Sequence, residues 1–215
     1  MRHLPRAALR QATLDMLHQV TQEVTSAADP KAKAKARWKA KSPKLKDTFD
    51  EVRAALEAMA SGHARCMYCE DSLGTDIDHF WPKADFPDRA FTWENYLLAC
   101  SYCNSNLKRN QFPRDAAGQP ELLDPTVDEP AEHLFFLPGN GRFLAIGPKG
   151  HQSIAVFGLN DNAAPRQLPA PVFRPYSAWR PSFGSTTAWR APTPPGPPSF
   201  GKPRGVTRSA GSSCG

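Results

Sequence analysis

Long apolar runs are absent from this 215-residue sequence, and the amino-terminal stretch MRHLPRAALR lacks the apolar core of a secretory signal peptide. A membrane-spanning helix needs about 20 consecutive, predominantly apolar residues. We therefore expect a soluble protein that makes no contact with a membrane and has a cytoplasmic location. The hydrophobic content of 40% and the five tryptophans still permit a packed core in one or two domains.

Acidic residues are missing from the last part of the chain. Residues 165–215 contain no Asp or Glu, 11 of the 22 prolines and seven Lys or Arg, which predicts a disordered tail. A native basic arm and an altered reading frame that replaces a lost helix would both explain this composition. Because residues 1–164 carry 20 basic and 21 acidic side chains, the formal net charge of +6 comes from the tail and does not indicate a basic body.

Cysteine is scarce: five occur, and four of them form two Cys-x-x-Cys pairs. Both sulfurs of such a pair can point at one ion, and zinc prefers a closed shell of four thiolates when its role is structural. Disulfides, which a reducing compartment disfavours, and four unrelated buried cysteines are the alternatives. The spacing predicts a structural zinc site at Cys66, Cys69, Cys100 and Cys103, with Cys214 outside it.

An Asp-His pair, Asp78-His79, lies between the two cysteine pairs. It follows Ile77 and precedes Phe-Trp-Pro, which indicates a short strand that ends in a turn. A neutral imidazole can take a proton from water near pH 7, and an adjacent carboxylate can bind a hard cation. The ordinary alternative is a solvated Asp-His pair.

The pattern around this pair resembles a known family. Asn95 follows His79 by sixteen residues, and Asn104 comes directly after the second cysteine pair. With the stretches CxYCE, DIDHFWPK, WENYLLACSYCN and LKRNQFP, residues 66 to about 113 resemble the HNH endonucleases (ββα-metal or His-Me finger fold), in the cysteine-bearing bacterial type of Septu and retron-associated systems. The stretches LLDPT, EHLFF and FGLN extend the resemblance to about residue 160.

The resemblance implies a role for each residue of the pattern. His79 would be the general base that activates water, Asp78 and Asn104 would be ligands of the catalytic cation, and Asn95 would hold the hairpin loop and so orient His79. The third family position is often histidine, and the Asn104 found here favours Mg²⁺ or Mn²⁺.

The implied activity is hydrolysis of phosphodiester bonds, with DNA as the expected substrate. The resemblance also suggests a role in bacterial defence against phage, together with a partner ATPase of the kind found in Septu systems. An alternative from another class is a non-catalytic zinc module that binds nucleic acid or a partner protein. Such a module would need the four cysteines but not the Asp-His-Asn set.

Basic residues near the amino terminus are candidate nucleic-acid contacts. Residues 31–46 hold eight Lys or Arg and no acid, with Trp38 among them, so Arg37, Trp38 and Lys39 could meet phosphates and a base. A solvated, partly disordered linker is the alternative. On the helix expected to begin near residue 103, Lys108 and Arg109 could also reach a phosphate, whereas a solvated helix lysine is the ordinary alternative for Lys108.

Hydrophobic spacing predicts the remaining elements. Helices are expected at residues 8–27 and from residue 45 to residue 59. A short strand and turn are expected at 122–125, a helical turn at 130–134, and a β-hairpin from residues 142–146 and 152–157 around GPKG.

We thus expect an α+β protein with four regions. Residues 1–62 form a helical segment, 63–115 a zinc-stapled ββα-metal core, 116–164 a short β extension, and 165–215 the tail.

Overall fold

The computed structural model describes residues 1–40 and 42–161, and all of these residues lie in one compact unit. The predictions for residues 165–215 and Cys214 therefore lie outside the described residues. The helices and strands follow one another as α1 (Gln11–Thr25), α2 (Pro30–Lys39), α3 (Pro43–Met59), β1 (Asp76–His79), β2 (Tyr96–Ala99), β3 (Leu134–Leu137), β4 (Arg142–Ala145) and α4 (Gly147–Phe157). Short helical turns are η1 (Pro87–Arg89), η2 (Trp93–Asn95), η3 (Tyr102–Lys108) and η4 (Pro130–Glu132).

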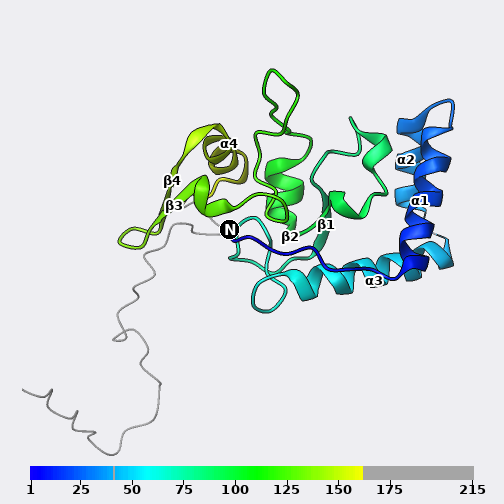
Figure 1. Ribbon diagram of the computed structural model, residues 1–215, viewed down its shortest axis with the longest axis horizontal. Coiled ribbons are helices and arrows are strands. Elements are labelled where there is room, and N and C mark those ends of the chain that lie inside the picture. Colours follow the sequence, from blue (N-terminus) through cyan, green and yellow to red (C-terminus); the bar gives the residue numbers. More distant parts are fainter. Residues whose placement is uncertain (41, 162–215) are drawn as a thin grey trace, which may run out of the picture. The chain divides into compact units, whose positions relative to one another are not determined.

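Helices α1 and α3 are amphipathic and confirm the two helices predicted from the hydrophobic spacing. Apolar residues spaced three or four apart put one face of each helix into the core, where Leu17 and Val20 of α1 and Val52 and Leu56 of α3 are at most 2% exposed. Helix α1 packs against both α2 and α3, and α3 packs against β2. Helix α3 runs along the β1–β2 hairpin, and α1 and α2 stand beside it, where both contact the turn η1 (Figure 1).

The basic run is largely helical: residues 31–39 lie in α2 and residues 43–46 begin α3, so a partly disordered linker is wrong for these residues. Helix α2 begins at Pro30, whose ring suits the first helical position, and the Asp29 side chain caps it by accepting a hydrogen bond from the Ala32 amide at 2.9 Å. Ala34 is buried, which fixes one face of α2 against its neighbours.

The centre of the fold is the two-stranded sheet that carries the Asp-His pair. Strands β1 and β2 are antiparallel, with Asp76 opposite Ala99 and His79 opposite Tyr96. The π-helical turn η3 follows β2 almost at once, so the chain order is strand, strand, helix. The predicted α+β class and its ββα core are confirmed.

The extension after the core differs from the prediction. The hairpin is formed by β3 and β4. The GPKG segment and residues 152–157, predicted as the turn and the second strand, form helix α4 instead. Pro148 suits the first turn of a helix, and Gly150, Ser153 and Phe157 recur at helical spacing on its buried face. At Gly150 a Cβ would stand 2.1 Å from the carbonyl oxygen of His133, so glycine lets α4 pack closely there.

Two smaller predictions for the extension have different outcomes. The helical turn at Pro130 is confirmed as η4. Residues 122–125 form no strand among the described residues, although the chain does turn from Pro125 onward.

None of the helices in residues 1–40 and 42–161 combines the length and the apolar character that a membrane crossing requires.

Candidate functional site

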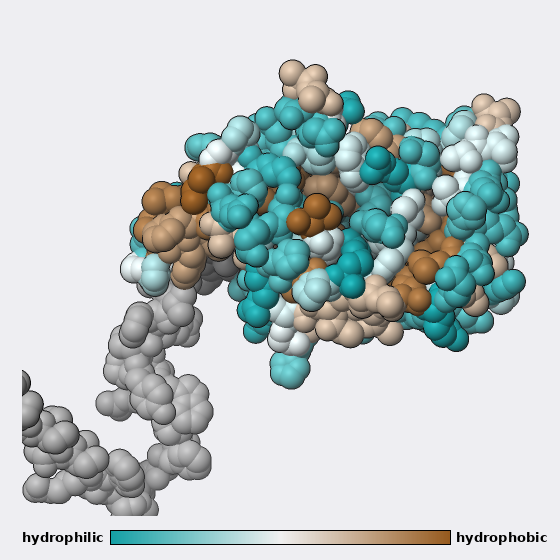
Figure 2. Space-filling model, viewed as in Figure 1, coloured by the Kyte–Doolittle hydropathy of each residue, from teal (hydrophilic) through white to brown (hydrophobic). Residues whose placement is uncertain are grey.

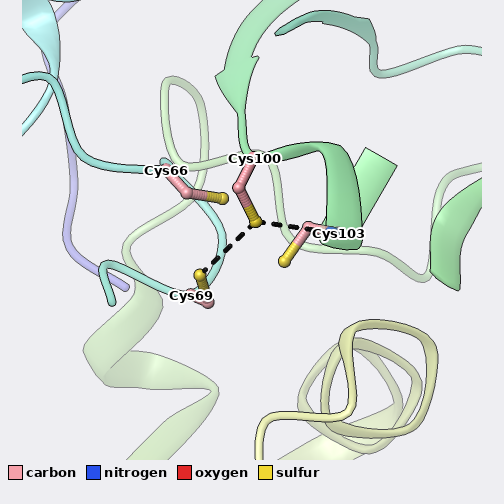
Figure 3. A group of neighbouring side chains, drawn as sticks. All are labelled: Cys66, Cys69, Cys100 and Cys103. Atoms are coloured by element: carbon pink, nitrogen blue, oxygen red, sulfur yellow. Dashed lines mark hydrogen bonds between the residues drawn. The ribbon is translucent and has the colours of Figure 1, made fainter. Parts of the chain in front are cut away.

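The four cysteines of the two Cys-x-x-Cys pairs meet at one point. Cys66 and Cys69 lie in the turns before β1, Cys100 directly follows β2, and Cys103 lies on η3. Their sulfur atoms lie within 4.8 Å of one another and converge from two chain segments (Figure 3). Unrelated buried cysteines are therefore wrong as an explanation of the two pairs.

The distances in this cluster fit a metal shell and not a disulfide. The sulfurs of Cys69 and Cys100 are 4.0 Å apart, whereas a disulfide requires about 2.05 Å, and all four thiols are free. A tetrahedral ion with metal–sulfur bonds of about 2.3 Å would hold its sulfurs roughly 3.8 Å apart. Hydrogen bonds with Cys103 and Cys66 lower the pKa of the Cys100 thiol to about 7, and the same contacts raise the pKa of Cys66 and Cys103. A metal ion that binds here would displace the protons that remain on the thiols. The four cysteines could hold one metal ion.

His79 ends strand β1 with a buried imidazole, 4% exposed. Its Nε2 atom lies 3.0 Å from the carbonyl oxygen of Ala90, which also accepts a hydrogen bond from the Tyr96 hydroxyl at 2.9 Å. A carbonyl oxygen can only accept, so Nε2 carries the proton and Nδ1 is the basic nitrogen of the neutral ring. The ring edge of His79 also packs against Trp38 of α2, with ring centroids 4.3 Å apart.

Asp78 is buried and held by two donors. Its Oδ2 atom accepts a hydrogen bond from the Tyr68 hydroxyl at 2.6 Å and lies 3.0 Å from the Lys108 ammonium, which also donates to the His79 carbonyl at 2.6 Å. Burial, with the charge of Asp78 next in importance, raises the pKa of Tyr68 well above its usual value, so the phenol stays protonated and donates. Since Asp78 is only 3% exposed, the solvated Asp-His pair is wrong.

Lys108 lies in the core. Its side chain is 0% exposed, so the solvated helix lysine is wrong. Its ammonium neutralises Asp78 and binds the end of β1, which joins η3 to the Asp-His pair. Contact of Lys108 with a phosphate stays a prediction.

Asn95 ties together the loop that follows His79. Its side-chain oxygen accepts from the Trp81 amide at 2.7 Å, and its amide nitrogen donates to the carbonyls of Trp81 and Arg89 at 3.0 and 2.9 Å. Its own carbonyl accepts from the Phe80 amide, the residue directly after His79, at 2.9 Å. The role of Asn95 in orienting His79 stays a prediction, and these bonds are the contacts through which it would act.

Asn104 is half-buried on η3 and lies next to β1. Its amide nitrogen donates to Oδ2 of Asp76 at 3.0 Å, so its carbonyl oxygen is the atom that it can offer to a cation. Asp76 and Asp78 are two apart on one strand and therefore share a face of the sheet.

One pocket brings together three of the four residues predicted for catalysis, and Asn95 does not line it. It has a volume of about 390 Å³, and Asp78, His79 and Asn104 all line it. Arg109, where the chain takes a φ of +49° after η3, and Trp38 lie in its wall.

Of the residues of the basic run that were predicted to contact nucleic acid, Arg37 and Lys39 lie outside this pocket. Arg37 turns toward α1, where its Nε lies 3.3 Å from a carboxylate oxygen of Glu23, and Lys39 is exposed outside the pocket lining. Trp38 is half-buried and packs edge-on against Phe49 with ring centroids 5.0 Å apart, so part of its ring is already covered. Nucleic-acid contact by these residues stays a prediction.

The comparisons with known proteins agree with this geometry. Residues 66–110 match the family model described as HNH endonuclease, and this span begins at the first cysteine and ends just after η3. Residues 66–110 form an HNH domain. This domain contains the β1–β2 hairpin, the turn η3 and the four clustered cysteines.

Two relatives that match part of the chain carry the name Septu protein PtuB. The relative from Bacillus mycoides (strain KBAB4) is 31% identical over 52% of this chain and 47% of its own length. The relative from Bacillus thuringiensis is 31% identical over 39% of this chain and 32% of its own length. The chain thus spans about half, or less, of the length of these curated relatives.

Four residues around the HNH domain site were given no individual role from the sequence, although Lys31 and Lys35 lie in the basic run. Asp76 had a signal, because it alternates with Asp78 along β1, and so had Lys31 and Lys35, which precede Trp38 by seven and three residues and line the pocket with it. Tyr68 had none, because its partner Asp78 becomes visible only in three dimensions.

Proposed function

We propose that this chain is a metal-dependent endonuclease that hydrolyses phosphodiester bonds in DNA. The observation that supports the proposal most directly is the shared pocket of Asp78, His79 and Asn104 within the HNH domain. A histidine base, a carboxylate and an amide oxygen are the groups that metal-assisted phosphodiester hydrolysis requires.

His79 acts as the general base in this proposal. The Ala90 carbonyl fixes the proton on Nε2, so Nδ1 accepts the proton of the attacking water. Burial of the ring between Trp38 and Tyr96, with centroids 4.3 and 5.4 Å from that of His79, limits its rotation. Help from a positioned general base is typically worth about 10²–10⁴-fold in rate.

Asp78 and Asn104 would hold the catalytic cation through their oxygen atoms, which suits Mg²⁺ or Mn²⁺. When bound, such a cation neutralises the charge that develops on the phosphate and stabilises the leaving 3′ oxygen. Tyr68 and Lys108 fix the carboxylate of Asp78, and Asp76 occupies the amide nitrogen of Asn104, so both candidate ligands are oriented by the chain itself.

The cysteine cluster would hold a structural zinc ion. Four free thiols within 4.8 Å fit the closed all-sulfur shell that structural zinc prefers. Because Cys66 precedes β1 and Cys100 follows β2, this ion would close the base of the hairpin that carries the Asp-His pair.

The biological setting is inferred from the relatives. Their name, Septu protein PtuB, and the resemblance to Septu and retron-associated proteins support a role in defence against phage with an ATPase as partner. The chain matches only part of each relative, so it is the HNH domain, and not the partnership, that supports the nuclease activity.

A plasmid-nicking assay tests the proposal. The purified chain should convert supercoiled plasmid to nicked circles only when Mg²⁺ or Mn²⁺ is added. Ligase should reseal the nicks, because attack of water on phosphorus breaks its bond to the 3′ oxygen and leaves a 3′ hydroxyl and a 5′ phosphate. His79→Ala should reduce the rate by about 10²–10⁴-fold.

Each other outcome has a distinct meaning. A chain that binds DNA but never nicks it with either cation would favour the non-catalytic zinc module. Cleavage that proceeds at full rate in excess EDTA would refute the oxygen-liganded cation.

A further inference from the structure

Helix α2 turns one face toward the proposed active site. Lys31 and Lys35 are four residues apart, Trp38 is three further on, and all three line the same pocket as His79. Residues at this spacing lie on one side of a helix, so the two ammonium groups and the indole form a single surface.

The position of this face is fixed by packing. Ala34 is 1% exposed, Arg37 pairs with Glu23 of α1, and the Trp38 ring meets Phe49 of α3 edge-on. Helix α2 therefore carries Lys31 and Lys35 as groups held beside the pocket and not as part of a loose basic arm.

A third lysine completes the surface from the HNH domain. Lys83 lies four residues after His79, is half-buried, and has its ammonium 5.5 Å from the centre of the Trp38 ring. Within residues 1–40 and 42–161, no carboxylate lies within ion-pair distance of Lys83. Burial lowers the pKa of Lys83, and the charge of Asp78 acts in the opposite direction. An anion bound beside Lys83 would stabilise its charged form and so offset part of the cost of burial.

The charge balance of the pocket favours an anionic ligand. Its lining has four cationic side chains, from Lys31, Lys35, Lys83 and Arg109, against one carboxylate, that of Asp78. Asp78 is already paired with Lys108 behind the pocket. Excess positive charge next to a general base suits the sugar-phosphate backbone of a nucleic acid.

We propose that Lys31, Lys35 and Lys83 bind the backbone phosphates next to the scissile bond, with Trp38 as the spacer between them. This inference rests on the proposed nuclease function and adds that α2, outside the HNH domain, forms part of the substrate site. It moves the contact in the basic run from Arg37 and Lys39 to the helix face that lines the pocket.

A salt titration with charge-matched variants tests the inference. The full-length chain is mixed with a fluorescently labelled 20-base-pair DNA duplex, without added divalent cation or chelator, and anisotropy gives the affinity at several salt concentrations. Each contacted phosphate contributes about 0.9 to the slope of log affinity against log salt. Lys31→Ala/Lys35→Ala should therefore reduce the slope by roughly 2 and weaken binding by on the order of tenfold or more at low salt.

Lys33→Ala/Lys44→Ala is the matched control. It removes the same charge from exposed lysines of α2 and α3 that do not line the pocket, and it should change the slope by less than about half a unit. Equal losses of slope in both double variants, an unchanged slope in the Lys31/Lys35 variant, or no salt-dependent binding by the native chain would each overturn the proposal.

Lys83 is tested by charge rescue. Lys83→Gln should reduce the slope by about 1, and Lys83→Arg should restore it, because a phosphate contact requires the charge and packing alone does not. A Gln variant with the native slope would remove Lys83 from the set.

Measurements of binding and of cleavage test the lysine surface and the nuclease chemistry separately. His79→Ala tests the chemistry and should keep the native slope, since it removes no cation. If the native chain nicks plasmid but the Lys31/Lys35 variant keeps the native salt slope, the lysine surface alone is refuted. If the variant loses slope as expected but the native chain does not nick plasmid, the catalytic assignment alone is refuted.

Discussion

The two hairpins of this protein differ in how they are surrounded. In β1 and β2 only Asp76 and Ile77 are half-buried, and the other six residues are buried, whereas in β3 and β4 only Leu134 is buried. The outer face of the second hairpin exposes Phe135 and Leu144, at 57% and 52%, as part of an apolar patch at that end of the molecule (Figure 2).

The first hairpin is held from several directions. The cysteine cluster closes its base, η3 binds it through Lys108, and α3 packs on β2. Close packing is visible at Gly74, where a Cβ would stand 2.3 Å from Cγ of Leu98. The second hairpin packs mainly on α4. Asp78 and His79, which are proposed for chemistry, therefore lie on the hairpin whose neighbours fix its geometry. The two hairpins should respond unequally to substitution.

Removal of the cysteine shell should have the largest effect. Cys66→Ser/Cys100→Ser should lose the bound metal and the cooperative unfolding of the HNH domain, because apparent binding energies of structural zinc are about 10–16 kcal/mol. Elemental analysis gives the metal content, and differential scanning calorimetry gives the unfolding transition. A double variant that kept both the metal and the transition would contradict a structural metal at this cluster.

Separation of the buried ion pair should come next. Lys108→Met leaves Asp78 without its cation at 3–4% exposure and should lower the free energy of unfolding by about 3–5 kcal/mol in a urea titration. Lys149→Met is the control, since its partner Asp128 and its own side chain are partly exposed and the loss should be about 1 kcal/mol or less. Equal losses would refute the distinction between the two regions.

Substitution on the open hairpin should have the smallest effect. Phe135→Thr/Leu144→Thr keeps residues that favour strands and removes apolar surface that faces solvent, so the free energy of unfolding should change by about 0.5 kcal/mol or less. A loss above about 2 kcal/mol would show that this face is covered in solution.

Helices α1 and α3 and the cysteine cluster could be predicted because their residues recur at short, regular spacing in the sequence. The periodic apolar residues of α1 and α3 and the two Cys-x-x-Cys pairs each carry their signal within a few residues, and the structure confirms the helices and the cluster. Helix α2 was not predicted because its alternating Lys and Ala have no apolar period, and its capping by Asp29 and the docking of Trp38 decide its place.

Residues 147–157 were predicted wrongly because their local signals favour a turn and a strand over the helix that forms. Gly147, Pro148 and Gly150 suggest a turn, but here they begin α4 and allow its close approach to His133. The apolar alternation that follows fits a strand and a helix about equally well over so few residues.

Parts of the candidate site depended on distant partners. The sequence predicted His79, Asp78 and Asn104 as one set, and the pocket brings them together. It could not predict that Lys108, 30 residues from Asp78, would be buried against it, or that Tyr68 would donate to the same carboxylate. Pairing of a buried charge is decided by tertiary structure, which local patterns do not encode.

The most direct test of the account compares single-turnover nicking rates of His79→Ala and Phe135→Thr/Leu144→Thr with the native rate, at saturating Mg²⁺ and equal metal content of the cysteine cluster. His79→Ala should lose about 10²–10⁴-fold in rate while it remains folded by circular dichroism at the assay temperature, and the variant of the second hairpin should keep a near-native rate. A His79→Ala protein that nicks plasmid at the native rate would contradict the central claim.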